Sequence, residues 1–505
     1  MRAIALIDQA LNHADRPAIV DAGQTYSFAH LLEASARVAA GLLAARACAD
    51  LAGERVCFMI APGFEYVATQ WGIFRAGGVA VPLCVSHPAP ELAHVLDDAK
   101  PSLVVADREH VEKLRELCQV RRLQLQEAAG LRASPPAAAL PALAGDRHAL
   151  LIYTSGTTGK PKAAITTHAI LEAQMTSIVQ AWELSPRDRL LHVLPLHHLH
   201  GVLNALGAPL FAGACVEFLP RFDAQAVLER FRADPPLTLF MGVPTIYAKL
   251  AQSAEELPAA ARSELREKLS RLRVMISGSA ALPVSLLNQF EALSGHVLLE
   301  RYGMTELGMA LGNPLHGERR PGTVGVPFPH VEARIVDEDA QALPDGAQGE
   351  LQIRGPNVFA GYFGKAEATR EAFTADGFFR TGDVAIRERG YYRLLGRESV
   401  DIIKTGGFKV SALEIEEVLR EHPAIAEVAV IGVPDAEWGE RVAAHVVLRA
   451  GKALELDELR SFGKARLAPY KVPSRLRCES ALPRNVMGKV HKPSLAQLWR
   501  EQAAR

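Results

Sequence analysis

Short runs of apolar residues, each closed by turn-forming residues, recur through the N-terminal part of the chain. They cover residues 55–60, 79–83, 103–106, 190–194, 237–241, 273–276 and 297–299. Segments with apolar residues at helical spacing lie between many of them, for example residues 282–293. Short buried strands that alternate with helices are typical of an α/β domain with largely parallel sheets. Ligands of such domains gather beyond the carboxyl ends of strands, so polar motifs that follow these runs are candidate site residues.

The pattern changes near Gly396. Ser411 and Glu414 have capping-box spacing, which predicts a helix start, and strand-like runs follow at 427–433 and 441–448 before an amphipathic helix at 456–467. We therefore predict an N-terminal domain over residues 1–396 and a small α+β domain over residues 397–505. The stretch 119–146 is rich in Ala, Pro and Arg and is expected to be a variable connector.

The balance of charges excludes some partners. With 56 basic and 57 acidic residues, the chain has no overall field that would attract nucleic acid or a membrane surface. The first 17 residues have an apolar face broken by acidic and polar residues, which fits neither a secretory signal nor a transmembrane span. The six cysteines form no CxxC pair, which favours reduced thiols. We expect a cytoplasmic protein without nucleic-acid partner or transmembrane segment.

The loop 153–162, YTSGTTGKPK, is the strongest candidate for anion binding. Two glycines let backbone N–H groups approach anionic oxygens, while hydroxyl and ammonium groups add donors and positive charge. Its candidate phosphate ligands are Thr154, Ser155, Gly156, Thr157, Thr158, Gly159 and Lys160. A flexible surface turn is the alternative, but the loop directly follows the apolar run 149–152. The spacing also differs from a Walker A loop, because Pro161 follows Lys160.

This loop resembles the signature of the adenylate-forming enzymes, which include acyl-CoA synthetases, luciferases and nonribosomal peptide synthetase adenylation domains. Ala163 stands where that family usually has Gly. The resemblance covers nearly the whole chain, and it implies a large α/β domain followed by a mobile C-terminal domain. It also implies ATP, Mg²⁺ and coenzyme A, with a small carboxylic acid converted through an acyl-AMP to an acyl-CoA.

Two further motifs match this family. In residues 300–306, ERYGMTE, Thr305 can donate to a phosphate and Glu306 is a hard oxygen ligand suited to Mg²⁺. The resemblance makes both residues catalytic, adds Thr158 as a second metal ligand, and assigns Tyr302 and Gly303 to the nucleotide. In the motif 381–383, Asp383 would accept hydrogen bonds from the ribose hydroxyls. From the residues alone, a solvated loop Glu and a turn Asp are the alternatives.

Two C-terminal motifs resemble the hinge and the catalytic loop of the family. Residues 396–410, GRESVDIIKTGGFKV, match the hinge, with Arg397 at the ribose. The residues that would face the active site in the thioester-forming state are Lys404, Gly406, Gly407 and Phe408. In residues 483–489, PRNVMGK, Lys489 would place a cation between the attacking carboxylate and the α-phosphate, where negative charge accumulates. Lys492 is the alternative lysine.

Three histidines at positions 197, 198 and 200 raise the question of a metal. Strand alternation would separate them onto two faces, and no convincing further ligands accompany them, so we predict no metal site there. By resemblance, residues 194–201, 241–247 and 277–281 form the acyl pocket. The candidate pocket residues are His198, His200, Ser277, Gly278, Ser279, Asn288 and Arg301.

The acid is less constrained than the reaction. Three motifs, ERYGMTE, IKTGGFKVSALEIE and PRNVMGK, are most similar to malonyl-CoA synthetases and the related acyl-CoA synthetase family member 3 group, both with Arg at position 301. This implies malonate or methylmalonate. Bacterial malonyl-CoA synthetases carry an Arg at the position of Asn288, whereas mitochondrial-type relatives lack it, so a medium-chain fatty acid remains the alternative.

Two other classes of protein are less favoured. A carrier-protein-loading adenylating enzyme would carry an acidic residue in the stretch LPLHHLHG, and a non-catalytic nucleotide-binding relative would be expected to lose Lys489 or Glu306. Monomer and homodimer are both left open.

Overall fold

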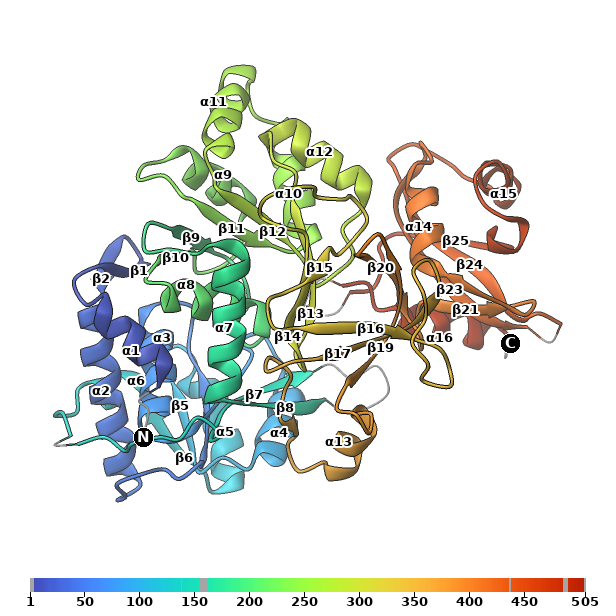
Figure 1. Cartoon of the computed structure of the whole chain (residues 1–505). Coiled ribbons are helices and arrows are strands. Elements are labelled where there is room, and N and C mark those ends of the chain that lie inside the picture. The colour runs from blue at the N-terminus through green and yellow to red at the C-terminus, as the bar shows by residue number, and fades with distance from the viewer. Residues whose placement is uncertain (1–3, 138, 155–160, 436, 485–488, 504–505) are drawn as a thin grey trace.

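The computed structural model describes residues 4–137, 139–154, 161–435, 437–484 and 489–503. Its strands form sheets of nine, seven, four and five strands. Figure 1 shows the two largest sheets with their helices, and the red C-terminal part on the other side of the four-stranded sheet. The predicted fold class, a large α/β unit with a small α+β unit, is confirmed.

The seven-stranded sheet has the order β18-β8-β7-β4-β3-β5-β6 and is parallel from β7 to β6. Its strands are β3 (Arg55–Met59), β4 (Val79–Pro82), β5 (Leu103–Ala106), β6 (Gln124–Glu127), β7 (His148–Thr154), β8 (Lys162–Thr167) and β18 (Gly361–Tyr362). Its connecting helices are α3 (Phe64–Arg75), α4 (Ala89–Ala99), α5 (Val111–Arg121) and α6 (Ala128–Arg132). Residues 119–146, predicted to be a variable connector, contain β6 and α6, so part of this stretch has regular secondary structure.

The nine-stranded sheet has the order β15-β14-β13-β12-β11-β9-β10-β1-β2, with parallel pairs from β13 to β1. Its strands are β1 (Pro17–Asp21), β2 (Gln24–Ser27), β9 (Arg189–His192), β10 (Cys215–Phe218), β11 (Leu239–Gly242), β12 (Val274–Ser277), β13 (Leu299–Met304), β14 (Gly308–Gly312) and β15 (Val326–Pro327). The helices of this part are α1 (Ala5–Asn12), α2 (Phe28–Ala45), α7 (His168–Trp182), the π-helix η1 (His200–Gly207), α8 (Ala208–Phe211), α9 (Ala224–Arg232), α10 (Pro244–Glu255), α11 (Ala259–Ser270) and α12 (Val284–Ser294).

Most predicted strands of these two sheets exist, with bounds shifted by no more than two residues. The run 297–299 is the exception. Its strand β13 begins at Leu299 and continues to Met304, so most of the ERYGMTE motif is strand and only its end is a turn. The predicted helix 282–293 is α12.

One hydrophobic core joins both large sheets. It contains Trp71 and Phe58 from the seven-stranded side together with Phe240 and Tyr247 from the nine-stranded side, all at most 1% exposed. Helix α7, drawn between the sheets in Figure 1, contributes Trp182 to the same core. Because the two sheets share one core, their relative position is fixed. The loops at their strand ends can therefore form the walls of a binding site.

Helix α2 has a composition that could suit a membrane. Its 18 residues have a mean hydropathy of 1.2, long and apolar enough to cross a bilayer, but 56% of the helix is buried inside the protein. It packs against α3 and α6, and Ser27 caps its start. A buried core helix meets the same criteria of length and composition.

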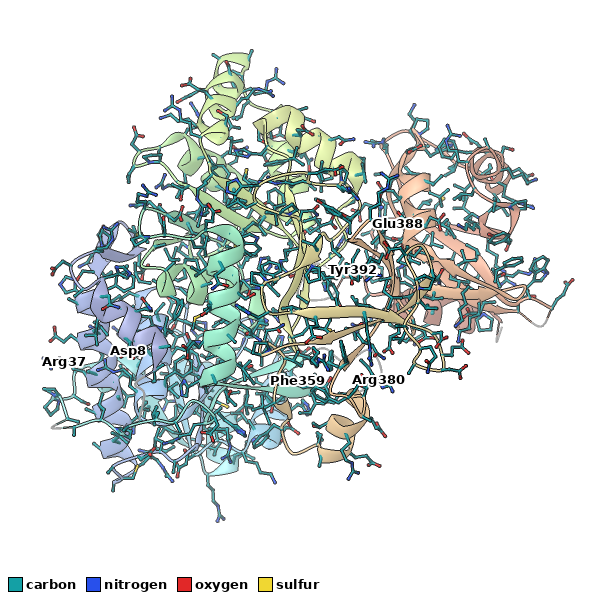
Figure 2. The ribbon with its side chains drawn as sticks, in the orientation of Figure 1. Asp8, Arg37, Phe359, Arg380, Glu388 and Tyr392 are labelled. Atoms are coloured by element: carbon teal, nitrogen blue, oxygen red, sulfur yellow. The ribbon has the colours of Figure 1, made fainter. Side chains whose placement is uncertain are left out.

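The four-stranded sheet is antiparallel, with the order β16-β17-β19-β20. Its strands are β16 (Glu332–Val336), β17 (Gln348–Arg354), β19 (Phe379–Glu388) and β20 (Tyr391–Arg397), with helix α13 (Ala366–Ala372) beside it. Tyr392, labelled in Figure 2, donates to the backbone oxygen of Ala333 at 3.0 Å. The backbone N–H of Phe359, also labelled, donates to the carbonyl of Glu306 at 2.7 Å and so ties this region to the β13–β14 turn.

The C-terminal part has its own sheet and core. The strands are β21 (Ile402–Thr405), β22 (Phe408–Ser411), β23 (Ile425–Asp435), β24 (Gly439–Leu448) and β25 (Arg475–Glu479), and the helices are α14 (Ala412–Arg420), α15 (Leu456–Lys464), the 3₁₀ helix η2 (Pro469–Lys471) and α16 (Lys492–Ala503). Ile415 and Leu419 of α14 pack against Val430 and Val446 of the sheet. The predicted domain boundary at residue 396 lies at the end of β20 and stays a prediction.

Only half of the predicted capping box forms. The hydroxyl of Ser411 accepts from the backbone N–H of Glu414 at 3.2 Å, as an N-cap should. The Glu414 carboxylate instead accepts from Lys471 Nζ at 2.6 and 2.7 Å, which fixes α14 to η2.

A buried ion triad connects the segment after β20 with the C-terminal helices. Lys492 Nζ lies 2.5 Å from Asp401 Oδ1 and 2.8 Å from Glu416 Oε1. Burial alone would lower the pKa of Lys492, but Glu416 and Asp401 outweigh it and raise the pKa, so the ammonium stays charged. Asp401 Oδ2 also accepts from the backbone N–H of Arg397, so the triad orders the chain between the two parts.

We predict that Lys492→Met destabilises the C-terminal part by about 3–5 kcal/mol, because two carboxylates lose their buried cation. Hydrogen exchange of the α14 and β23 amides should then be faster by the corresponding factor. Lys409→Met is the matched control, since Lys409 pairs with Glu338 at the surface and such pairs contribute about 0–1 kcal/mol. Equal protection in both variants would show that the triad does not hold this part together.

Candidate active site

Three predicted nucleotide residues meet where the nine-stranded and four-stranded sheets adjoin. Asp383 on β19 and Arg397 at the end of β20 are register partners, and Arg397 Nε lies 3.0 Å from Asp383 Oδ1. Tyr302 of β13 donates its hydroxyl to Asp383 Oδ2 at 2.6 Å. Burial, followed by the charge of Asp383, raises the pKa of Tyr302 well above its ordinary value, so the phenol keeps its proton. Asp383 lies in a strand, which excludes the alternative of a turn Asp, and its role at the ribose stays a prediction.

Glu306 lies at a buried turn. Thr305 and Glu306 occupy the turn between β13 and β14, and a Cβ at Gly303 would lie 2.0 Å from the carbonyl oxygen of Gly308, so this close turn requires glycine. Glu306 is only 6% exposed, and its Oε1 accepts from the Tyr362 hydroxyl at 2.9 Å. Burial raises the pKa of Glu306. A desolvated carboxylate with lone pairs left over fits a hard divalent cation such as Mg²⁺.

The predicted phosphate loop begins and ends beside this carboxylate. Thr154 ends β7 and donates its hydroxyl to the carbonyl of Lys162 at 3.3 Å, while Lys162 Nζ lies 4.4 Å from the ring centre of Tyr362. Tyr362 is the residue that donates to Glu306. The predicted ligands Ser155, Gly156, Thr157, Thr158, Gly159 and Lys160 lie outside the described residues.

Lys489 is the lysine predicted to act at the α-phosphate. Its backbone follows the undescribed residues 485–488, and the residue is exposed. Desolvation, followed by the charges of Arg397 and Arg301, lowers the pKa of Lys489. Lys492, by contrast, is buried in its ion triad. The ion triad holds Lys492 away from a catalytic role, and the role of Lys489 at the α-phosphate stays a prediction.

The hairpin predicted to serve the second half-reaction is well defined. Gly406 and Gly407 join β21 to β22 with φ of +56° and +82°, as a tight hairpin turn requires. A Cβ at Gly406 would lie 2.9 Å from the Trp438 ring, whereas Gly407 faces open space. Phe408 is 50% exposed and stacks on Tyr470, and Lys404 is exposed. The role of these residues in thioester formation stays a prediction.

A buried polar cluster connects β12, β13 and η1. Ser279 Oγ lies 3.1 Å from His200 Nδ1, and Arg301 Nη2 lies 3.5 Å from the same hydroxyl. A Cβ at Gly278 would lie 2.4 Å from Arg301 Nε, so glycine is required for the guanidinium to occupy this place. Ser279 has a φ of +69°, a left-handed conformation that is costly for a residue with a side chain and common at functional sites.

Several buried atoms of this cluster have no hydrogen-bond partner among the described residues. They are His198 Nε2, His200 Nε2, Ser277 Oγ and Arg301 Nε. In the described part of the chain Arg301 also has no carboxylate partner, although it is 3% exposed. Burial lowers the pKa of Arg301 to about 9, which leaves it charged at neutral pH, and burial followed by Arg301 lowers the pKa of His200 well below its ordinary value. Buried polar groups are normally satisfied, so these atoms are candidate contacts for a ligand.

A cavity of about 370 Å³, a volume suited to a small-molecule ligand, adjoins the two histidines of this cluster. His198 and His200 line it, together with Val243 and Ile246 from the predicted segment 241–247. Asn288 is exposed on α12, and its role in the pocket stays a prediction. The cavity is also lined by residues that the motifs did not predict, namely Tyr66, Leu83, Cys84, Arg221, Phe222 and Lys249. Cys84 directly follows the apolar run 79–83, so its place at a strand end was a signal that could have identified it.

One part of this cavity contains possible metal ligands that were not expected beside His197. Cys84 and His87 lie far from His197 in the sequence, but each offers a ligand atom within 4.8 Å of a His197 ring nitrogen. Burial alone would raise the pKa of Cys84, but hydrogen bonds with His197 and His87 lower it to about 5. The expectation that no convincing further ligands accompany these histidines was therefore wrong for His197.

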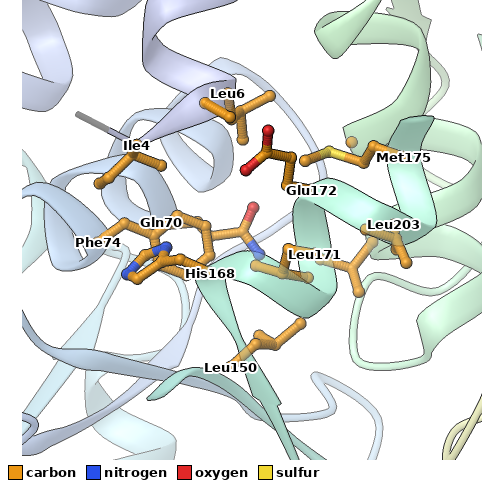
Figure 3. A pocket seen from close by; sticks show the side chains of 13 residues that line it. Ile4, Leu6, Gln70, Phe74, Leu150, His168, Leu171, Glu172, Met175 and Leu203 are labelled. Atoms are coloured by element: carbon orange, nitrogen blue, oxygen red, sulfur yellow. The ribbon is translucent and has the colours of Figure 1, made fainter. Parts of the chain in front are cut away.

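A second cavity lies away from this site. Figure 3 shows it near α1, lined by Ile4, Leu6, Phe74, Leu171 and Met175 with the polar side chains of Gln70, His168 and Glu172. Its volume is about 20 Å³, room for roughly one water molecule. It is too small for a substrate.

The sequence matches models of two known protein domains and is similar to characterised proteins. The family model described as AMP-binding enzyme matches residues 6–363, and the model of the AMP-binding enzyme C-terminal domain matches residues 414–489. The malonate–CoA ligase ACSF3, mitochondrial, of Mus musculus is 44% identical over 96% of this chain and 89% of the mouse protein.

Two solved structures are also similar. The crystal structure of ATP-bound MatB from Rhodopseudomonas palustris superposes with a TM-score of 0.91 at 35% identity, covering 99% of this chain and 100% of that one. A malonyl-CoA ligase ternary product complex with methylmalonyl-CoA and AMP, at 37% identity, covers 93% of this chain and 97% of that one with a TM-score of 0.68. The chain therefore belongs to the AMP-binding enzyme family.

Proposed function

We propose that this protein is an AMP-forming acid–CoA ligase whose acid is malonate or methylmalonate. The observation that carries the choice of acid is the buried guanidinium of Arg301, which has no carboxylate partner among the described residues. A short dicarboxylic acid supplies one carboxylate to react and another to pair with this cation. The mouse relative named malonate–CoA ligase supports the same choice.

In the first half-reaction one carboxylate of the acid attacks the α-phosphate of ATP and pyrophosphate leaves. Asp383, held by Arg397 and Tyr302, is placed to accept from the ribose hydroxyls. Lys489 supplies the cation that stabilises negative charge as the acid oxygen approaches phosphorus. A Mg²⁺ ion at Glu306 would neutralise phosphate charge, and the loop 155–160 would surround the phosphates.

In the second half-reaction the CoA thiol displaces AMP from the acyl-AMP. Lys489 would leave the cleft, and rotation of the C-terminal part about the segment after β20 would bring the Gly406–Gly407 turn to the acyl-AMP. The higher TM-score with an ATP-bound structure, 0.91, than with a thioester product complex, 0.68, supports assigning the present arrangement to adenylation. Gly407 offers room because no atom lies within 4 Å of a Cβ built there.

A medium-chain monocarboxylic acid is the second candidate substrate. The cavity of about 370 Å³ exceeds the needs of malonate, and Leu194, Val243 and Ile246 give it apolar walls. Such an acid would leave Arg301 unpaired in a buried place, which costs several kcal/mol. We also propose Mg²⁺ as the metal ion, because the Glu306 carboxylate is a hard oxygen ligand, and a cytoplasmic location.

We predict that CoA-dependent AMP release by the wild-type enzyme is fastest with malonate or methylmalonate among a panel that includes acetate, butyrate, octanoate and benzoate. Arg301→Gly should lower kcat/KM for malonate by about 10²-fold or more, since several kcal/mol of pairing are lost at about 1.4 kcal/mol per tenfold. Activity on butyrate should fall far less.

Arg301→Lys is the matched control, because it keeps the charge but not the bidentate fork, and it should retain an intermediate preference for malonate. A wild-type preference for octanoate, or equal losses on malonate and butyrate in Arg301→Gly, would replace malonate by the medium-chain acid.

We predict that Lys489→Ala slows acyl-AMP formation by about 10²-fold or more, because it removes a preorganised charge at the α-phosphate. Pyrophosphate exchange measures this step. Thioester formation from supplied acyl-AMP should stay near wild type, since Lys489 has left the cleft by then. If pyrophosphate exchange were unchanged, another cation would serve the α-phosphate.

We predict that Gly407→Leu blocks transfer to CoA while pyrophosphate exchange continues, because a side chain at the hairpin tip obstructs the pantetheine arm. Gly451→Leu is the matched control: Gly451 also has positive φ, +73° against +82°, and open space around it in the same part of the chain. Both changes carry similar backbone strain. Loss of both half-reactions in Gly407→Leu, or the same pattern in both variants, would contradict the proposed rotation.

A further inference from the structure

The corner of the acid cavity formed by Cys84, His87 and His197 has no role in the proposed reaction. Cys84 follows β4 of the seven-stranded sheet, His87 precedes α4, and His197 follows β9 of the nine-stranded sheet. Each offers one ligand atom, a sulfur and two ring nitrogens, and these atoms all lie within 4.8 Å of one another. The cluster therefore joins the loops of the two large sheets.

The chemistry of this set is that of a metal site. A tetrahedral zinc ion with the usual bond lengths to sulfur and imidazole nitrogen separates its ligand atoms by about 3.5 Å. Small side-chain rotations would bring the three atoms from their present spacing to this value. Soft thiolate together with imidazole selects zinc over the hard Mg²⁺ that carboxylates and phosphates prefer.

The surroundings of the cluster also point to a ligand. His197 Nε2 is buried and has no hydrogen-bond partner among the described residues. Glu91 Oε2 lies 3.3 Å from His87 Nε2, the carboxylate–histidine arrangement that orients a metal-binding imidazole and leaves its other nitrogen for the metal. The His87 and His197 rings are 5.5 Å apart, face to edge, so both can turn toward one point near the Cys84 sulfur.

We infer that Cys84, His87 and His197 form a zinc-binding site on the wall of the acid cavity. This inference goes beyond the proposed ligase activity and does not depend on the identity of the acid. Three protein ligands leave one coordination position open. Cys84 and His197 line the cavity, so that position would face the space in which the acid binds.

Cobalt(II) is the probe, because it takes the place of zinc and reports its own coordination by colour. Titration of the full chain without ATP should give one equivalent of tetrahedral cobalt with a thiolate charge-transfer band, and zinc should displace it. Cys84→Ser should remove this band and weaken zinc binding by more than the roughly 100-fold that loss of an outer partner can cost. Cys478→Ser removes an exposed thiol and should change neither measurement.

Two further variants keep the test decisive if Cys84→Ser fails to fold, which thermal unfolding without metal would reveal. His87→Gln should abolish tetrahedral binding, and Glu91→Gln should weaken zinc affinity by about 10- to 100-fold with the charge-transfer band retained. Absence of stoichiometric cobalt in the wild-type chain, or a band that persists in Cys84→Ser or His87→Gln, would show that the cluster is a hydrogen-bond network only.

Discussion

The constraint on which the rest of the site depends is the buried guanidinium of Arg301, which has no carboxylate partner in the part of the chain that the structure describes. Arg301 lies in β13, and its guanidinium fits beside Gly278 because glycine has no side chain. Removing this charge from water costs free energy. Its neighbours supply no carboxylate among the described residues; His200 is kept neutral, and Ser279 offers only a weak contact at 3.5 Å. A carboxylate ligand is the group that would compensate this charge.

Lys492, a buried cation of the C-terminal part, differs from Arg301 because carboxylates surround it. Lys492 is paired with Asp401 and Glu416 and orders the segment through which the two parts are joined. Despite its burial, the carboxylates raise the pKa of Lys492, whereas desolvation, followed by the charges of Arg397 and Arg301, lowers the pKa of Lys489.

Much of the site could be predicted from the sequence because its motifs are short and contiguous. Tyr302 and Asp383 were named as nucleotide residues from separate motifs, and the structure joins them at 2.6 Å. The parallel strands were recognisable because strands buried on both faces are continuous apolar runs. Errors arose where local signals compete. Residues 300–304 were interpreted as following a strand, but pairing with β14 extends β13 through the polar motif. Glu414 has capping-box spacing, yet Lys471 offers its carboxylate a stronger, charged partner.

The sequence by itself determined the fold class, the family, the order of the motifs and the chemical type of each candidate residue, because these depend on residue identity and on spacing within a few turns. Only the tertiary structure decided which groups share a space. Cys84 and His197 are 113 positions apart, and no periodicity relates them, but the ends of β4 and β9 face each other across one cavity. Among the described residues Arg301 has no carboxylate partner, whereas Lys492 has two, Asp401 and Glu416. Both results depend on packing. The charge of a residue follows from its identity, but whether that charge is paired depends on neighbours that only the tertiary fold brings close.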